Sequence, residues 1–242
     1  MLACMSAFQE ALGLAARGGR AFELDGVMAA IVPGLPDLAL ANAAVYRDAA
    51  GLGLALPLLE RAYVEAGVRR SLIWVPPGDE GAHDALREAG YALDSEAPAM
   101  ALDLERLPAE DDPLDDWSDT PDPAEIAQIV ERSYGLQDGA IHAAIRGWLE
   151  PATAYVARLD GRPACCLTLI RQGPDAGVFL VGTIPEARGR GLARRLLLHA
   201  LHAARAAGAT VSTLQSSRLG YPVYKRLGYV ELCRLGMWER GR

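Results

Sequence analysis

A glycine- and arginine-rich segment joins an apolar run to an amphipathic pattern in the C-terminal third of this 242-residue chain. Residues 178–181 form the apolar run, residues 183–194 (TIPEARGRGLAR) form the segment, and helical periodicity begins at Leu192. A strand that ends in such a segment and continues as a helix presents the free backbone N–H groups of the helix N-terminus. Gly189 and Gly191 lack a Cβ, so a ligand can approach the main chain closely. We therefore expect a strand–loop–helix unit that binds an anion, above all a phosphate or pyrophosphate.

The composition is that of a folded globular protein. Hydrophobic residues make up 51% of the chain and charged residues 23%, which excludes wholesale disorder. The formal net charge of −7 argues against a general nucleic-acid binder, which would have a basic face. No apolar run approaches the roughly 18–20 residues of a membrane span, and the N-terminus has no secretory pattern. We expect a cytoplasmic monomer or homodimer without nucleic-acid or membrane partners.

The four cysteines do not have the spacing of metal ligands. They are Cys4, Cys165, Cys166 and Cys233, and the adjacent pair would point to opposite faces of a strand. We interpret them as buried, reduced thiols and expect no metal site.

The C-terminal half alternates between helical and strand-like patterns. Asp160-Gly161 has the composition of a hairpin turn, and Gly208 and Gly228 follow helical patterns as stop signals. The order of the predicted elements indicates an α/β sheet domain. They are helices at 123–134 and 141–149, hairpin strands at 154–159 and 164–171, a strand at 175–183, a helix at 192–207, a strand at 210–215, a short helix at 222–227 and a strand from 229.

The N-terminal half has a similar rhythm, which suggests an internal repeat. Its predicted elements are a strand at 42–46, a helix at 54–66, a strand at 72–75, a helix at 82–89, and strand-like residues at 91 and 100–104. Asp48 to Gly53 (DAAGLG) resembles a worn copy of residues 188–193 (RGRGLA), with Asp48 in the place of Arg188. A carboxylate there would repel a phosphate. An unrelated acidic turn is the alternative, and we favour a degenerate repeat.

An acidic stretch separates the two halves. Residues 105–122 contain several prolines, many aspartates and little apolar periodicity, which is typical of a solvated linker. We therefore predict an N-terminal domain at 1–104, an acidic linker at 105–122 and a C-terminal domain at 123–242.

Two common phosphate-binding motifs do not fit the glycine-rich segment. A Walker loop ends in Gly-Lys-Ser or Gly-Lys-Thr, and the only lysine of this chain is Lys225. A dinucleotide fingerprint requires Gly-x-Gly-x-x-Gly, and Arg194 stands at its third glycine position.

The pattern Arg/Gln-x-x-Gly-x-Gly/Ala is met at Arg188, Gly191 and Ala193. It closely resembles the acetyl-CoA loop of the Gcn5-related N-acetyltransferase (GNAT) family. About thirty residues downstream, LQSS at 214–217 leads into GYPVYKRLGY at 220–229, which is similar to the closing helix of that family. The resemblance covers about residues 123–239 and implies a mixed, mostly antiparallel central sheet flanked by helices. The N-terminal half is similar to the cofactor-less repeat of tandem members.

The resemblance assigns the acetyl-CoA contacts to two segments. Main-chain groups of Val181, Gly182 and Thr183 would pair with the pantetheine arm as an added strand would, and one N–H could polarise the thioester carbonyl. The pyrophosphate would lie in the loop. Arg188 and Arg190 could add positive charge there, or either could instead be a surface or ion-pair residue. Ser217 stands where many members have Asn. The implied loop residues are Arg188, Gly189, Arg190, Gly191, Leu192, Ala193 and Arg194.

Tyr224 is the residue that the resemblance places as the general acid. A phenol can protonate a departing thiolate at neutral pH, although Tyr224 could instead be an ordinary packed aromatic. The sequence does not identify a general base. Glu131, Asp138 and Glu150 are each expected to be solvated, and Glu186 to be a loop residue rather than the base. No catalytic or metal-binding role is expected for His142, His199 and His202.

The resemblance implies an N-acetyltransferase that moves the acetyl group of acetyl-CoA to a primary amine by direct attack in a ternary complex. Neither Cys165 nor Cys166 has a visible histidine partner for a covalent route. A protein that binds acyl-CoA as a sensor, without turnover, is the alternative from a different class. The amine acceptor and the acyl length cannot be predicted from the residues.

Overall fold

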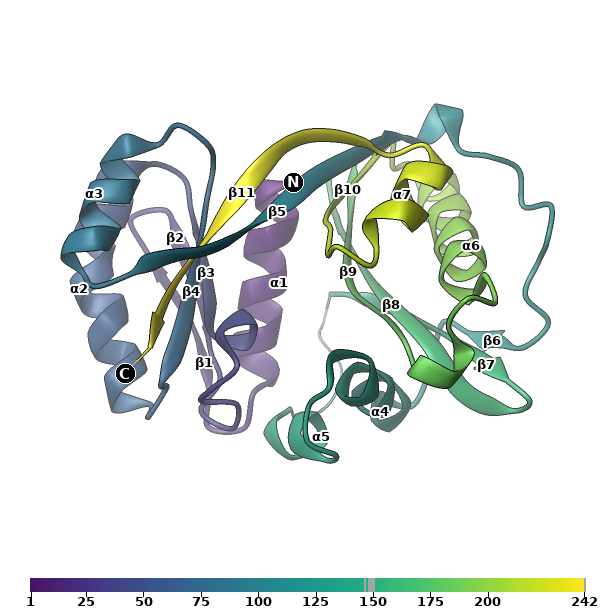
Figure 1. Cartoon of the computed structure of the whole chain (residues 1–242), viewed down its shortest axis with the longest axis horizontal. Helices are drawn as coiled ribbons and strands as arrows, with labels where there is room; N and C mark the ends of the chain where they lie inside the picture. Colours follow the sequence, from purple (N-terminus) through teal and green to yellow (C-terminus); the bar gives the residue numbers. More distant parts are fainter. Residues whose placement is uncertain (146, 148–150, 242) are drawn as a thin grey trace. The chain divides into compact units, whose positions relative to one another are not determined.

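The computed structural model describes residues 1–145, 147 and 151–241. These residues form two compact units (Figure 1). The N-terminal unit comprises residues 2–97, 143–149 and 233–242, and the C-terminal unit comprises residue 1 and residues 98–142 and 150–232. Each unit therefore includes a segment from the opposite end of the chain. No helix among the described residues is long and apolar enough to cross a membrane.

The N-terminal unit is a small sheet between helices. Its strands follow the order β1-β2-β3-β4-β11, antiparallel except for the parallel pair β3 and β4. Helices α1 and α2 lie on opposite faces of this sheet (Figure 1), and α2 and β11 contribute Leu59, Tyr63 and Trp238 to a shared core. The elements are α1 (Leu2–Ala15), β1 (Arg20–Leu24), β2 (Val27–Ile31), η1 (Ala39–Asn42), β3 (Ala43–Tyr46), α2 (Ala49–Glu65), β4 (Arg70–Val75) and α3 (Glu80–Glu88).

The C-terminal unit is likewise a sheet between helices. Its sheet has the order β5-β10-β9-β8-β7-β6, antiparallel except for the parallel pair β9 and β10. Helices α4 and α6 cover opposite faces (Figure 1). The elements are η2 (Leu104–Arg106), β6 (Trp117–Ser118), α4 (Pro123–Tyr134), α5 (Ala140–Ala144), β7 (Thr153–Leu159), β8 (Arg162–Gln172), β9 (Asp175–Thr183), η3 (Pro185–Ala187), α6 (Leu192–Ala206), β10 (Val211–Gln215) and α7 (Tyr221–Leu227). The predicted fold class, a mixed and mostly antiparallel sheet with flanking helices, is confirmed.

The strands β5 (Ala92–Asp103) and β11 (Val230–Gly241) are divided between the units. Residues 99–103 of β5 pair with β10, whereas residues 236–241 of β11 pair with β4. The spatial units therefore differ from the predicted division into 1–104 and 123–242. The prediction followed the order of the chain and assigned β5 to the N-terminal domain and β11 to the C-terminal domain. Backbone hydrogen bonds instead pair each of these strands with a strand from the other half of the chain.

The stretch 105–122 is not a free linker. Trp117 and Ser118 form strand β6 against β7, and the residues before them lie along α6. Glu110 contacts His199 at 2.9 Å, while Asp111 and Asp112 form exposed ion pairs with arginines of the first turn of α6. The aspartates, expected to be solvated, are exposed but paired. Sequence periodicity could not show this, because the contacts are ion pairs and single buried side chains such as Leu107 and Leu114, which have no regular spacing.

Candidate functional site

The strands β9 and β10 pair at one end and separate at the other. Their parallel ladder runs from Val211–Asp175 to Leu214–Val178 and stops there. On its other side β9 stays paired with β8 as far as Thr183. Within the part of the chain that the structure describes, residues 180–183 therefore have one edge without a strand partner. This open edge includes Val181, Gly182 and Thr183, the three residues predicted to bind pantetheine.

A β-bulge interrupts β9 beside this open edge. Cys166 pairs with Gly182 and Thr168 with Phe179, so β9 has one more residue than β8 in this interval. The two residues of β9 without a partner in this ladder are Leu180 and Val181, and they lie opposite Leu167 of β8. Leu180 has φ of 50°, a left-handed conformation that costs a non-glycine residue roughly 1–2 kcal/mol. Strain of this kind is retained where the surrounding contacts enforce it.

The surrounding side chains hold the two peptide groups of the bulge. The Cys166 thiol donates to the carbonyl oxygen of Leu180 at 3.3 Å, and Gly182 is the ladder partner of Cys166 on β8. The Tyr134 hydroxyl donates to the carbonyl oxygen of Val181 at 3.2 Å. Side chains thus bind both carbonyl oxygens of the bulge, that of Leu180 through Cys166 and that of Val181 through Tyr134. The N–H of Val181 has no partner in the β8–β9 ladder.

The loop after β9 ends in a helix N-terminus that no side chain caps. Gly191 is the N-cap of α6 with φ of 75°, and Gly189 has φ of 76°. The first intrahelical bond is donated by Arg195 to Gly191, so the N–H groups of Leu192, Ala193 and Arg194 remain available. No carboxylate lies in the first turn. This geometry can bind a phosphate.

The corresponding helix of the N-terminal unit has a different N-terminus. Asp48 caps α2, and its carboxylate accepts the N–H of Gly51 at 2.8 Å. Only residues 47 and 48 lie between β3 and α2, whereas eight residues lie between β9 and α6. A Cβ at Gly51 would also lie 2.1 Å from the carbonyl oxygen of Asp25. Asp48 therefore matches Gly191 in position, not Arg188, and no phosphate loop precedes α2. The repeat itself stays a prediction.

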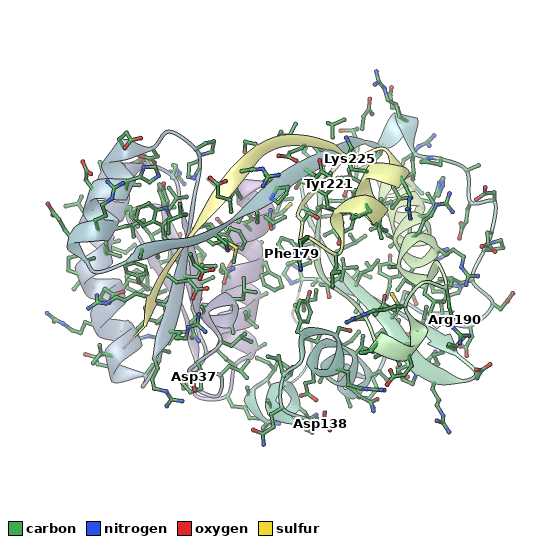
Figure 2. All side chains as sticks on the ribbon, viewed as in Figure 1. Asp37, Asp138, Phe179, Arg190, Tyr221 and Lys225 are labelled. Atoms are coloured by element: carbon green, nitrogen blue, oxygen red, sulfur yellow. The ribbon has the colours of Figure 1, made fainter. Side chains whose placement is uncertain are left out.

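The arginines of the loop point in different directions. Arg188 donates to the carbonyl oxygens of Thr183 and Ser133, each at 3.2 Å, and so ties the end of β9 to α4. Arg190 is exposed (Figure 2). Arg194 faces Asp111 at 3.7 Å, in an exposed pair that contributes little stability. Arg190 and Arg194 therefore remain the candidates for contact with a bound anion.

Tyr224 lies on α7 with only 6% of its surface exposed. Its ring meets that of Tyr229 edge to face at 5.8 Å between centroids. Burial, and then the proximity of Tyr134, Tyr229 and Cys165, raises the pKa of Tyr224 far above its ordinary value. The hydroxyl therefore keeps its proton at any physiological pH.

Ser217, the other predicted residue in this region, precedes α7. Its hydroxyl oxygen accepts the N–H of Gly220 at 3.1 Å. That bond leaves its O–H free to donate to a ligand. Tyr221 and Lys225 lie on the same short helix (Figure 2).

Gly220 provides the space that the Tyr224 ring occupies. A Cβ at Gly220 would lie 2.7 Å from Cε2 and 3.3 Å from Oη of that ring, although φ of −75° and ψ of −30° suit alanine. From the predicted acid role of Tyr224, we expect Gly220→Ala to displace the hydroxyl and lower kcat for acetyl transfer about tenfold, since small displacements of reacting groups cost this much or more. Steady-state kinetics would measure it. Gly53→Ala, on α2 with open space around its Cβ, is the control, and equal losses in both variants would refute the expectation.

Among the candidate general bases of this helical region, Glu131 has a structural role. Glu131 was expected to be solvated, but it is buried and accepts the N–H groups of Gly139 and Ile141 at 2.9 and 2.7 Å. Glu131 thus caps the N-terminus of α5. The expectation was wrong because a sequence pattern does not show which loop folds back onto a helix. Asp138 lies in the exposed loop before α5 (Figure 2). Glu150 lies outside the described residues.

Of the remaining candidates, His142 lies exposed on α5, and the others bind protein groups. Glu186 pairs with Arg132 at 2.8 Å. His199 stacks near Trp117 with ring centroids 3.9 Å apart, and His202 contacts the carbonyl oxygen of Pro108 at 2.9 Å. Both histidines thus hold the segment before β6. Among the described residues, no group of three or more His, Cys, Asp or Glu side chains could hold a metal ion.

Sequence reasoning missed Tyr134 and the role of Cys166. Tyr134 looks like the last residue of an amphipathic helix followed by a glycine C-cap. Cys166 was interpreted only as a buried thiol. A bulge leaves no signature in an apolar run such as 178–181, so nothing in the sequence indicated which side chains hold it.

Comparisons with known proteins show which proteins this chain is similar to. Residues 150–231 match the family model of the acetyltransferase (GNAT) domain. A GCN5-related N-acetyltransferase from Kribbella flavida is 20% identical, with 99% of this chain and 95% of that chain aligned at a TM-score of 0.65. A GCN5-related N-acetyltransferase from Sphaerobacter thermophilus is 16% identical, covering 89% and 76% of the two chains at 0.57. A tandem GNAT protein from the clavulanic acid biosynthesis pathway is 17% identical over 82% and 75%, at 0.55. No curated protein matches the sequence.

Proposed function

We propose that this chain, which has the fold of the GCN5-related N-acetyltransferases and a GNAT domain at residues 150–231, transfers an acetyl group from acetyl-CoA to a primary amine. The observation that carries the proposal is the open edge of β9 directly before an uncapped helix N-terminus. The open edge of β9 suits the amide groups of a pantetheine arm, and the N-terminus of α6 suits a pyrophosphate. Both features lie in one continuous segment, residues 179–194.

The residues of this segment fit coenzyme A in order. Main-chain groups of residues 181–183 would pair with the pantetheine arm. The N–H groups of Leu192, Ala193 and Arg194 would bind the pyrophosphate, and Gly189 and Gly191 leave the main chain uncovered. Arg190 would add positive charge from solvent, and Ser217 a hydroxyl donor. Bound acetyl-CoA would supply the activated acyl carbon.

The N–H of Val181 would polarise the thioester carbonyl. A trans peptide directs its C=O and its N–H to opposite sides. The carbonyl of Leu180 faces the Cys166 thiol of β8, so we infer that the N–H of Val181 points away from β8 toward the open edge. A fixed donor there stabilises the negative charge that develops on the carbonyl oxygen during attack.

Tyr224 would donate the proton that the departing sulfur requires. As the bond from the amine nitrogen to the acyl carbon forms, the bond from that carbon to sulfur breaks, and sulfur takes the proton of Tyr224 Oη. The attacking amine must be neutral, and the proton it then loses passes to solvent, which reprotonates the tyrosine. No described carboxylate is assigned as the base, because Glu131 and Glu186 already bind protein groups.

The adjacent cysteines favour direct attack over an acyl-enzyme. Burial raises the pKa of the Cys165 thiol to about 12 and that of Cys166 well above its ordinary range. A protonated thiol is a poor nucleophile. Cys166 also uses its S–H to bind Leu180. An amine that attacks the thioester itself is therefore the simpler route.

A panel of amines tests the proposed function. The full-length protein is incubated with acetyl-CoA and polyamines, aminoglycosides, amino acids or peptides with free N-termini, and mass spectrometry follows the acetylated product. At least one amine is expected to yield an amide together with an equivalent of free CoA. Calorimetry with CoA runs in parallel. Binding without any amide product would instead identify a sensor of acyl-CoA.

A further inference from the structure

We propose that Tyr134 is a positioning residue for acetyl transfer: its hydroxyl fixes the carbonyl of Val181 and thereby the direction of the N–H that faces the acyl group. The inference rests on the proposed function and assigns the reaction a residue outside the cofactor loop and the general acid. Tyr134 is the last residue of α4. The contact joins it to β9 across 47 residues of sequence.

The C-terminal end of α4 packs directly on the bulge. A Cβ at Gly182 would lie 2.9 Å from Oγ of Ser133 and 3.4 Å from Cγ2 of Ile129. Only a glycine permits this approach of helix to strand. The last turn of α4 is thus in contact with the strand segment whose N–H groups would meet the pantetheine arm.

Three consecutive residues of α4 bind three points of the cofactor segment. Arg132 pairs with Glu186 of η3 at 2.8 Å. The carbonyl of Ser133 accepts from Arg188 at 3.2 Å. The hydroxyl of Tyr134 reaches the bulge itself. The first two contacts hold the loop, so Tyr134 alone of the three acts on the peptide next to the reacting carbonyl.

The hydroxyl of Tyr134 completes the restraint on Val181. The peptide before this residue is held through Cys166 and Leu180, which limits φ of Val181. The peptide after it is held at the oxygen by Tyr134, and its nitrogen belongs to Gly182, the ladder partner of Cys166, which limits ψ. A backbone residue has only these two soft torsions. Without the phenol oxygen, one of the two ends of that second peptide loses its partner, and the N–H of Val181 gains freedom of direction.

Exposure distinguishes Tyr134 from a core aromatic. Its side chain is 48% exposed, so removal of one oxygen creates no cavity. The hydroxyl nevertheless points to a backbone carbonyl rather than to solvent. We therefore expect Tyr134→Phe to fold normally, with a melting temperature within about 3 °C of wild type.

The matched control is Tyr155→Phe. Tyr155 lies on β7 of the same unit, and no hydrogen bond of its hydroxyl is found among the described residues. Loss of that oxygen leaves the bulge untouched. Both variants remove the same atom, and only one removes a bond to β9.

The experiment is isotope-edited infrared spectroscopy of acetyl-CoA labelled with ¹³C at the carbonyl, bound without amine. The carbonyl stretching frequency of acetyl-CoA bound to the wild type is expected to be lower than that of acetyl-CoA free in water, because the Val181 N–H polarises the C=O bond. Tyr134→Phe should lose at least half of this shift, and kcat with an amine from the panel should fall about tenfold with KM for acetyl-CoA within threefold. Tyr155→Phe should keep the wild-type values.

An unchanged band and a kcat within twofold in Tyr134→Phe would overturn the inference. So would equal changes in Tyr155→Phe, or a wild-type band that does not move on binding. Absence of acetyl-CoA binding by the wild type would refute the proposed function itself. Failure of the positioning role is therefore distinguishable from failure of the function.

Discussion

Tyr224→Phe is expected to lower kcat by about 10²-fold and to leave the affinity for CoA within about twofold. The phenol oxygen is the atom that would protonate the departing sulfur, and general acids of this kind contribute about 10²–10⁴-fold. The ring remains, so the packing against Tyr229 and the fit beside Gly220 persist. Steady-state kinetics with an amine from the panel measures kcat, and calorimetry measures the affinity.

The dependence of kcat on pH gives a second test of the acid role of Tyr224. An acid acts only while protonated, and burial raises the pKa of Tyr224 above its ordinary value near 10. The raised pKa moves the loss of this proton to higher pH, so kcat of the wild type should not fall between pH 8 and about 10 because of Tyr224. Tyr155→Phe is again the control. A Tyr224→Phe variant that retains more than half of the wild-type kcat would refute the assignment.

The parts of the fold that could be predicted from sequence are those set by local signals. Gly208 and Gly228 follow the ends of α6 and α7 with positive φ, and Asp160-Gly161 turns β7 into β8 with φ of 53° and 71°. Their left-handed backbone favours glycine or aspartate whatever the rest of the chain does. Asp122 likewise caps α4 through the N–H of Ala124. The glycine loop before α6 belongs to the same class.

The parts that could not be predicted depend on contacts distant in sequence. The bulge at Leu180 needs a thiol from β8 and a phenol from α4, and neither residue has a pattern of its own. Helix α1 carries buried residues on most of its circumference and a weak amphipathic pattern, so no periodicity indicated it. In the candidate site, the loop and Tyr224 were predicted through the family resemblance. The two residues that bind the carbonyl groups of the bulge, Cys166 and Tyr134, were not predicted.

The pairing of β5 with β10 also changes how the role of the N-terminal half can be tested. Deletion of residues 1–104 would remove Ala99–Asp103, which form the ladder partner of β10. Loss of activity in such a fragment would then reflect an unpaired strand in the C-terminal unit itself. Point substitutions in the full-length chain are therefore the informative experiments.

Gly191→Asp is expected to weaken CoA binding by about 10²-fold or more. Asp48 shows what a carboxylate does at the equivalent position of α2: it accepts a helix N–H and places negative charge where a phosphate would bind. At about 5 Å and an effective dielectric constant of about 20, one such charge repels a phosphate charge by about 3 kcal/mol. Calorimetry with CoA measures the affinity.

Gly191→Asn is the control that separates charge from strain. Both side chains must adopt φ of 75°, at a cost of roughly 1–2 kcal/mol that asparagine and aspartate share. The neutral amide lacks the repulsion, so this variant should bind CoA at least tenfold more tightly than Gly191→Asp does. Raising the salt concentration should narrow the gap, because salt screens exposed charges. Equal affinities for the two variants would show that Gly191 serves the backbone conformation alone, and that the N-terminus of α6 does not bind the phosphates.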